Sequence, residues 1–461
     1  MSLSLSMLLS SLGTSSANVG LPTLAQAFGA SFQQVQWIVL AYLLAITTLI
    51  VSVGRLGDLT GRRRLLLAGI FLFTLASLLC ALAPTLGLLI AARALQGLGA
   101  AVMMALTLAF VGETVPKART GSAMGLLGTM SAVGTALGPT LGGVLIARFG
   151  WPAIFFVNVP LGLLALGLAQ RFLPADRPAD RRGAKTKRNG LDPVGTLLLA
   201  LTLAAYALAM TTGRGSFGLL NLALLSAAAL GAGLFALAEA KAASPLIPLA
   251  MLRHPVLGAS FAMSLLVTSV VMTTLVVGPF YLSGALALDA ARVGLVLSAG
   301  PLAAALAGMP AGRLVDRFGP QRMTLAGLVA MATGAAATPM AAPAFGVPGY
   351  IAPLVVITAG YALFQVANNT AVMTSIQAEQ RGVISGLLGL SRNLGLITGA
   401  AVMGAVFALG AETSELTAAR PEAVAAGMRI TFAVGAALII VALAIASVSQ
   451  TLARRAALPS S

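Results

Sequence analysis

The chain has 461 residues, of which 58% are hydrophobic and only 9% are charged. Soluble domains carry about 25% charged residues, so this composition excludes a large soluble domain and indicates an integral membrane protein. The net charge of +16 comes mostly from Lys and Arg in short segments between apolar runs, which is typical of a membrane protein rather than of a nucleic-acid binder.

Apolar runs long enough to cross a bilayer, about 20 residues each, recur along the whole chain. We expect an all-α polytopic protein with fourteen spanning helices. They are expected at residues 3–27, 33–56, 64–83, 86–112, 119–146, 152–172, 192–212, 219–239, 256–283, 291–311, 321–342, 350–373, 381–409 and 428–450.

The connectors between these runs differ in charge. One set, counted with the adjoining helix ends, carries 21 of the 28 basic residues, and the other set carries five. Because basic residues stay on the cytoplasmic side, this asymmetry predicts that both termini face the cytoplasm from the cell (inner) membrane.

Two stretches repeat in the same order and at nearly the same spacing. "GRLGDLTG" at 54–61 returns as "GRLVDRFG" at 312–319, an offset of 258. A series of five glycines that begins at Gly121 returns at Gly382, an offset of 261. Paired halves are a known transporter architecture. We therefore expect a first six-helix half at 1–172, a linker with two inserted helices at 173–254, a second six-helix half at 255–450 and a cytoplasmic tail at 451–461.

The first repeated stretch places a carboxylate beside two arginines at a helix end. The glycines permit a tight turn, and such a charge cluster can hold one conformation and release it in another. The alternative is that the basic residues only fix topology. The candidate latch residues are Gly54, Asp58, Gly61, Arg62 and Arg63, with Asp316 and Arg317 in the repeat.

Two arginines lie within spans. An arginine inside a membrane costs about 2.5–3.5 kcal/mol on insertion scales and marks a functional site by default. Arg93 is followed by Gln96 and Gly97, in the pattern L-x-x-x-R-x-x-Q-G-x-G-A-A. Arg392 matches no such pattern. The alternative for either arginine is a structural anchor that donates to neighbouring carbonyls.

A third pattern, G-x8-G-x3-G-P-x2-G-G, interrupts the run at 119–146. Its residues are Gly125, Gly134, Gly138, Pro139, Gly142 and Gly143. Glycines spaced at four share a helix face and let backbones approach closely, while proline favours a kink. The face would let one half of the protein move tightly against the other or seal it against ions; the alternative is generic glycine packing.

These three motifs, found in this order, resemble the major facilitator superfamily, and within it the fourteen-helix branch of drug:proton antiporters. The resemblance covers essentially the whole chain. It implies the major facilitator fold, two six-helix halves plus two inserted helices, and transport by alternating access. It also implies a role for Arg93 and its motif in proton coupling or in the substrate cavity.

One departure from that branch concerns the coupling ion. Many relatives read L-D-x-T-x-x-N-V-A-L-P in the first helix, whereas this chain reads "LGTSSANVGLP", with Gly13 in place of the acid. All twelve Asp and Glu residues fall in connectors or at span ends. The residues therefore leave the coupling ion open, and proton antiport rests on the resemblance.

Other polar residues within spans could face a substrate or could simply hydrogen-bond neighbouring helices. These cavity candidates are Tyr42, Asn158, Tyr281, Tyr361, Gln365, Asn368 and Asn369. With two intramembrane arginines and no intramembrane carboxylate, we expect neutral or anionic amphiphilic substrates.

The leading hypothesis is a monomeric secondary transporter that exports small amphipathic compounds across the bilayer, with protons as the coupling ion. The alternative is a uniporter or metabolite exporter without proton coupling. An enzyme is not favoured because the spans hold no catalytic constellation, and a channel would not need two halves with a latch in each. His254 and Cys80 are the only residues of their kinds, and no phosphate-binding G-x-x-x-x-G-K-[ST] occurs, so we expect no metal, cofactor or ATP.

Overall fold

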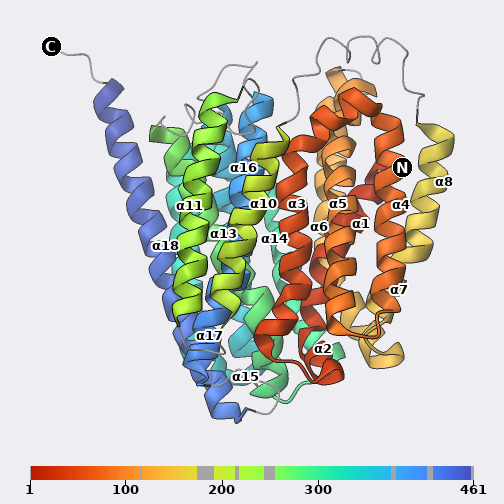
Figure 1. The fold of residues 1–461 in the computed structure, drawn as a ribbon. Helices are drawn as coiled ribbons and strands as arrows, with labels where there is room; N and C mark the ends of the chain where they lie inside the picture. Colours follow the sequence, from red (N-terminus) through yellow and green to blue (C-terminus); the bar gives the residue numbers. More distant parts are fainter. Residues whose placement is uncertain are drawn as a thin grey trace. The chain divides into compact units, whose positions relative to one another are not determined.

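The computed structural model describes residues 2–114, 117–173, 192–212, 218–242, 255–374, 381–412 and 419–457. Over these ranges the regular structure is entirely helical (Figure 1). Among the described residues, eleven helices are long and apolar enough to cross a membrane. The all-helical, multi-pass character expected from the composition is therefore confirmed, whereas the exact number of crossings remains a prediction.

The chain divides into two compact units. The first comprises residues 1–247 together with 289–295, and the second comprises 248–288 and 296–461. The helices of the first unit are α1 (Ser2–Val19), α2 (Leu21–Phe28), α3 (Phe32–Thr60), α4 (Arg62–Ala81), α5 (Leu86–Thr114), α6 (Lys117–Phe149), α7 (Ala153–Phe156), α8 (Asn158–Phe172), α10 (Pro193–Thr211) and α11 (Leu219–Lys241).

Within the first unit, α1 packs along α6, and both α3 and α4 pack along α5. The inserted helices α10 and α11 pack on each other, and α10 also packs on α3. Two hydrogen bonds fix α10 to α3: the Trp37 indole N–H donates to the Thr211 hydroxyl at 2.9 Å, and the hydroxyls of Ser52 and Thr196 are 3.0 Å apart. The inserted pair thus belongs structurally to the first unit.

The second unit contains α13 (Pro255–Gly284), most of α14 (Ala290–Phe318), α15 (Pro320–Thr374), α16 (Arg381–Thr398), a π-helical turn (Gly399–Met403), α17 (Gly404–Gly410) and α18 (Pro421–Ala457). The long element α15 consists of two limbs joined at Gly346, whose φ of 59° is left-handed. These limbs correspond to the two separate helices expected at 321–342 and 350–373.

Each unit contains the same kind of close contact between two glycines. On the first-unit pair α4 and α5, a Cβ added to Gly99 would lie 2.8 Å from the carbonyl oxygen of Gly69. Between the two limbs of α15, a Cβ added to Gly360 would lie 2.8 Å from the carbonyl oxygen of Gly327. The repeat seen in the sequence therefore extends to a matching close approach of backbones.

Two of the expected spans are interrupted. The first is divided between α1 and α2, and Pro22 lies in the first turn of α2. Proline is tolerated there because the first N–H groups of a helix have no acceptor within the helix. The span expected at 152–172 is divided into α7 and α8 at Val157. Both breaks lie near the helix ends, so each expected span still coincides with helical structure.

Candidate functional site

Arg93 on α5 lies at the centre of a buried polar cluster in the first unit. Its side chain is 0% exposed. Its Nε donates to the carbonyl oxygen of Ile38 on α3 at 2.9 Å, and its Nη1 donates to the carbonyl oxygen of Gly13 on α1 at 3.0 Å. The guanidinium carbon also lies 4.1 Å from the centroid of the Tyr42 ring. One side chain thus joins three helices through backbone acceptors and a cation–π contact.

A chain of side-chain hydrogen bonds continues from Arg93 to α4. Nη1 of Arg93 also donates to Oε1 of Gln96 at 2.5 Å, and Nε2 of Gln96 donates to Oγ of Ser77 at 2.7 Å. The Ser77 hydroxyl in turn donates to the carbonyl oxygen of Phe73 at 2.6 Å. The sequence motif had indicated Arg93 and Gln96, but Ser77 carries no sequence signal because it is one of many serines within spans.

The positive charge of Arg93 has no carboxylate beside it among the described side chains: its hydrogen-bond acceptors are two carbonyls and an amide. Its Nη2 is buried and has no hydrogen-bond partner within the described part of the chain. Burying a cation without a counter-ion costs free energy. Removing one of its hydrogen-bond acceptors costs more than removing the acceptor of a neutral donor. The cluster therefore creates a positive potential inside the first unit.

Gly13, where the resemblance to the antiporter branch implies a carboxylate, is enclosed by aromatic side chains. A Cβ added there would lie 3.2 Å from ring carbons of Phe73 and 3.2 Å from the Tyr42 hydroxyl. That hydroxyl donates to the carbonyl oxygen of Ser10 at 2.8 Å. A larger residue at Gly13 would have to displace at least one of the two rings.

Two further sequence candidates lie in the first unit. Asn158 on α8 is fully buried, and its Nδ2 donates to the carbonyl oxygen of Ile154 at 3.3 Å. A Cβ added to Gly97 would lie 2.5 Å from the carbonyl oxygen of Tyr42, so this glycine lets α5 approach α3 closely. Gly97 thus contributes packing that brings Arg93 next to the Tyr42 ring.

In the second unit a smaller polar group surrounds Tyr361 on α15. Its hydroxyl interacts with the side chains of Thr268 and Gln365, and the Arg392 guanidinium lies close enough to act on it electrostatically. Arg392 is half-buried, in contrast to the completely buried Arg93. These residues of α13, α15 and α16 form the second polar cluster.

The other second-unit candidates have different surroundings. Asn368 is buried, and its Nδ2 donates to Oγ of Ser264 at 3.1 Å. Asn369 is exposed, so it faces away from the core of its unit. The ring of Tyr281 stacks on that of Tyr350, with centroids 5.8 Å apart. Tyr350 was not a sequence candidate, because no motif distinguishes it.

The glycine motif of α6 contacts two neighbours. A Cβ on Gly134 would lie 2.5 Å from the carbonyl oxygen of Leu8, and one on Gly142 would lie 2.9 Å from a methyl group of Val19. A Cβ on Gly138 would overlap the Ser15 hydroxyl. Three glycines therefore face α1, and Pro139 lies within the same helix.

Gly143 points to a different neighbour, the beginning of α14, which belongs to the first unit. An added Cβ would overlap the Ala290 carbonyl and lie 3.1 Å from the Cα of Gly294. Gly294 was not predicted from the sequence, and the contact joins residues about 150 positions apart. Gly125 lies in α6 outside the residues whose side-chain surroundings are described.

The two proposed latch loops share a backbone feature. Gly61 between α3 and α4 has φ 98°, and Gly319 between α14 and α15 has φ 85°, values that favour glycine. The side-chain surroundings of Gly54 and Asp58 lie outside the described residues. Arg62 and Arg63 are half-buried, and Nη2 of Arg63 donates to the carbonyl oxygen of Gln170 on α8 at 2.5 Å. In the repeated loop, Asp316 and Arg317 are exposed.

One buried acid lies apart from both polar clusters. Glu239 lies near the end of α11, as expected from the sequence, and its side chain is 2% exposed. Its Oε1 lies 2.6 Å, and Oδ2 of Asp192 lies 2.5 Å, from the position of a Cβ added to Gly195 on α10. The inserted helices therefore bring two carboxylates together where glycine leaves room for them.

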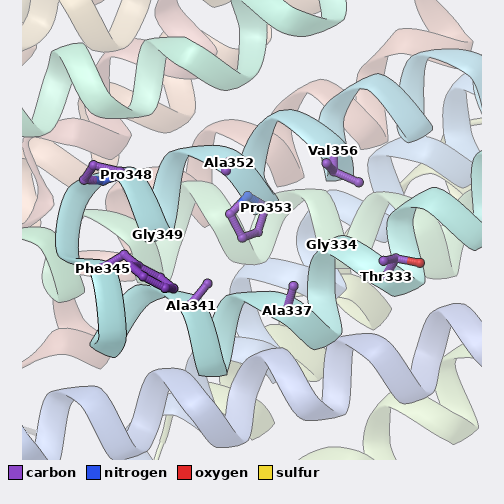
Figure 2. Close-up of a pocket in the computed structure, with 10 residues that line it drawn as sticks. All are labelled: Thr333, Gly334, Ala337, Ala341, Phe345, Pro348, Gly349, Ala352, Pro353 and Val356. Atoms are coloured by element: carbon purple, nitrogen blue, oxygen red, sulfur yellow. The ribbon is translucent and has the colours of Figure 1, made fainter.

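An apolar groove of about 470 Å³ lies between the two limbs of α15 (Figure 2). Phe345, Pro348 and Pro353 line it, and Thr333 supplies its one hydroxyl-bearing side chain. None of the sequence candidates whose surroundings the structure describes lines this groove. Since it offers almost no polar group, it cannot orient a polar substrate.

Among the described residues, no group of three or more His, Cys, Asp and Glu side chains could hold a metal ion. Helices long enough to span a bilayer, with polar clusters buried among them, define a multi-pass membrane protein as the class. The family model of the Major Facilitator Superfamily matches residues 3–400 and 259–457, and the chain belongs to this superfamily.

Similar proteins support this assignment. The chain is 31% identical over 402 residues to the multidrug resistance protein Stp of Mycobacterium tuberculosis, covering 85% of this chain and 72% of Stp. It is 31% identical over 409 residues to the riboflavin transporter RibZ of Clostridioides difficile, covering 87% and 86%. A crystal structure of a bacterial homologue of the human lysosomal transporter Spinster has a TM-score of 0.70 at 15% identity, covering 97% and 95%. The family and these relatives thus indicate a membrane transporter rather than an enzyme.

Proposed function

We propose that the protein exports small amphipathic compounds by alternating access between a six-helix half at 1–172 and a second at 255–450, with the two inserted helices within 173–254. The similarity to a multidrug resistance protein supports export. The glycine face of α6 supports a tight, movable helix contact. In this proposal the protein works as a monomer in the inner membrane, with both termini in the cytoplasm.

The observation that carries the substrate class is Arg93, a buried cation without a carboxylate partner among the described side chains. A lipophilic cation entering a region of positive potential would be repelled, and no described acid contacts the cluster to offset this. Substrates are therefore neutral or anionic amphiphiles, and organic dications are poor substrates.

In this proposal, export is coupled to protons. Gly13 replaces the carboxylate of many relatives, so the proton would be carried by Asp58 or by the substrate itself. The second candidate function is a uniporter or metabolite exporter without proton coupling; the similarity to a riboflavin transporter supports a metabolite as the substrate. The two candidates differ in whether a pH gradient drives accumulation.

The experiment uses the purified full-length protein in liposomes with an imposed pH gradient. Three dyes of similar size, dicationic, neutral and anionic, are compared with and without the gradient. We expect gradient-driven transport of the neutral and anionic dyes. Transport at the same rate with and without the gradient would favour the uniporter. Strong transport of the dicationic dye, at the same rate in Arg93→Ala, would contradict the electrostatic argument.

The topology is tested with single cysteines in a Cys80→Ala background. Cysteines at Thr186 and Ser216 should react with an impermeant reagent from opposite sides of the membrane. If both react from outside, the orientation proposed from the basic residues is wrong.

The latch is tested with Asp58→Asn. We expect transport to fall sharply while insertion and substrate binding are retained, because the substitution removes the charge but keeps the shape. If Asp58→Asn transports normally at a normal expression level, the basic residues of this loop only fix the topology.

A further inference from the structure

Ser77 on α4 ends the chain of hydrogen bonds that begins at Arg93, and no motif draws attention to it. We propose that Ser77 is a positioning residue: it fixes the orientation of the Gln96 amide and, through it, the guanidinium of Arg93. This inference rests on the proposed role of Arg93 in substrate selection and adds a residue to that site.

The orientation matters because an amide has two different ends. A guanidinium only donates hydrogen bonds, so Gln96 must present Oε1 to Arg93 rather than its NH₂ group. The two atoms are in hydrogen-bond contact, and two donors facing each other at these positions would repel. The amide therefore needs an acceptor on its other side.

Ser77 supplies that acceptor in one direction only. Its proton is donated to the carbonyl oxygen of Phe73 at 2.6 Å, so its oxygen is left to accept from Nε2 of Gln96 at 2.7 Å. Donor and acceptor roles thus follow one order along the chain, from Arg93 through Gln96 and Ser77 to Phe73. Reversing any one member would place two donors against each other.

Burial makes this order costly to break. The side chains of Ser77, Arg93 and Gln96 are each 0% exposed, so bulk water cannot replace a lost partner. With Nε and Nη1 committed to protein acceptors, Nη2 is the guanidinium nitrogen without a partner in the described part of the chain. Ser77 therefore helps to set the direction in which Arg93 can still donate.

The test compares transport of an anionic and a neutral dye of similar size by the full-length protein in liposomes. We expect Ser77→Ala to lower the ratio of kcat/KM for the anionic dye to that for the neutral dye about fivefold, because a buried donor loses its acceptor. Ser77→Thr keeps the hydroxyl and should restore the ratio to within about twofold.

Two further variants separate positioning from general packing. Thr74→Val removes a buried hydroxyl from the same helix, one that donates only to the Ile70 carbonyl at 2.7 Å, and should leave the ratio unchanged. In a Gln96→Leu background, Ser77→Ala should have no further effect on the ratio. An equal loss for both dyes, or the same fivefold loss in the Gln96→Leu background, would overturn the proposal.

A second measurement requires no substrate, so it separates this inference from the proposed function. The thermal unfolding midpoint is measured for Ser77→Ala, Gln96→Leu and the double variant. We expect the double variant to unfold near the midpoint of Gln96→Leu alone. Additive shifts would show that Ser77 acts independently of Gln96, even if the protein transported neither dye.

Discussion

The pair α4–α5 and the two limbs of α15 use the same glycine contact, yet they surround it with different chemistry. Gly69 meets Gly99 in the first pair, and Gly327 meets Gly360 in the second. The offset of 261 that relates Gly99 to Gly360 takes Arg93 to Leu354, which is buried. A repeated backbone arrangement thus holds a cation in one unit and an aliphatic side chain in the other.

The difference extends to the neighbours of Arg93. The same offset takes Gln96 to Ile357, and the offset of 258 takes Tyr42 to Gly300. Backbone carbonyls are present in any helix, but the amide and the aromatic ring that accompany Arg93 have no counterpart at these positions. Close helix packing therefore depends on small residues shared by both halves, whereas the cluster around Arg93 depends on side chains found in one.

The largest expected effect comes from adding an arginine at the repeat-related position of the second half. Leu354→Arg should destabilise the protein by about 2.5–3.5 kcal/mol, because the buried cation would lack the amide acceptor and the aromatic ring. The measurement is folded yield in detergent together with the thermal unfolding midpoint. Leu354→Met, which costs under about 1.5 kcal/mol, is the size control. A stable Leu354→Arg protein would mean that backbone carbonyls alone can hold this cation.

The next effect concerns the glycine face of α6. Gly138→Leu should stop transport while the protein still inserts, because even its Cβ would overlap the Ser15 hydroxyl, with an overpacking cost of roughly 1–3 kcal/mol. Gly167→Leu on α8 is the matched control, since no atom lies within 4 Å of an added Cβ there. Efflux and membrane content are measured for both. Normal efflux by Gly138→Leu would show that the glycine motif reflects generic helix packing and has no role in transport.

A smaller effect is expected from neutralising the cation in place. Arg93→Gln should lower the preference for the anionic over the neutral dye about tenfold, equivalent to about 1.4 kcal/mol. The same change at the half-buried Arg392 should have less effect, since solvent screens an exposed charge more strongly. The measurement is the ratio of transport of the anionic dye to that of the neutral dye in liposomes. A greater loss at Arg392 would move the selective charge to the second unit.

The smallest effect tests a shared feature of the two halves. Oγ of Ser15 can donate to the Gly134 carbonyl at 3.3 Å or to the Ser11 carbonyl of its own helix at 3.2 Å. Oγ of Ser269 can likewise donate to the Gly395 carbonyl at 3.0 Å or to the Leu265 carbonyl at 2.9 Å. Ser15→Ala and Ser269→Ala should each lower the free energy of unfolding by about 0.5–1.5 kcal/mol. Denaturant titration in detergent measures both. Markedly unequal losses would show that the repeated contact is not energetically equivalent.

Much of the scaffold could be predicted from the sequence because its signals are local. Long apolar runs identify spanning helices, and glycines spaced at four identify a face for close packing. Arg93 stood out because a charge inside an apolar run is costly. The superfamily followed from three motifs in order, and the comparisons with known proteins confirmed it.

The details of the site could not be predicted in this way. Ser77 is one polar residue among many, and only the packing of α4 on α5 brings it to Gln96. The Gly143–Gly294 contact joins distant parts of the chain, and spacing within one helix says nothing about which neighbour a glycine meets. Glu239 lies near the end of its helix, and its place in the sequence does not indicate that it is buried.

The sequence by itself determined that this chain is helical, crosses the membrane many times, repeats its glycine pattern and carries a charge within a span. Those properties follow from hydropathy and from residue spacing along one helix. Only the tertiary structure decided that Arg93 is completely buried, which acceptors it meets and that Leu354 occupies its repeat-related position in a similar glycine-packed pair. The physical reason is that hydrogen-bond partners and burial are set by contacts between helices, and these bring together residues that the linear order keeps apart.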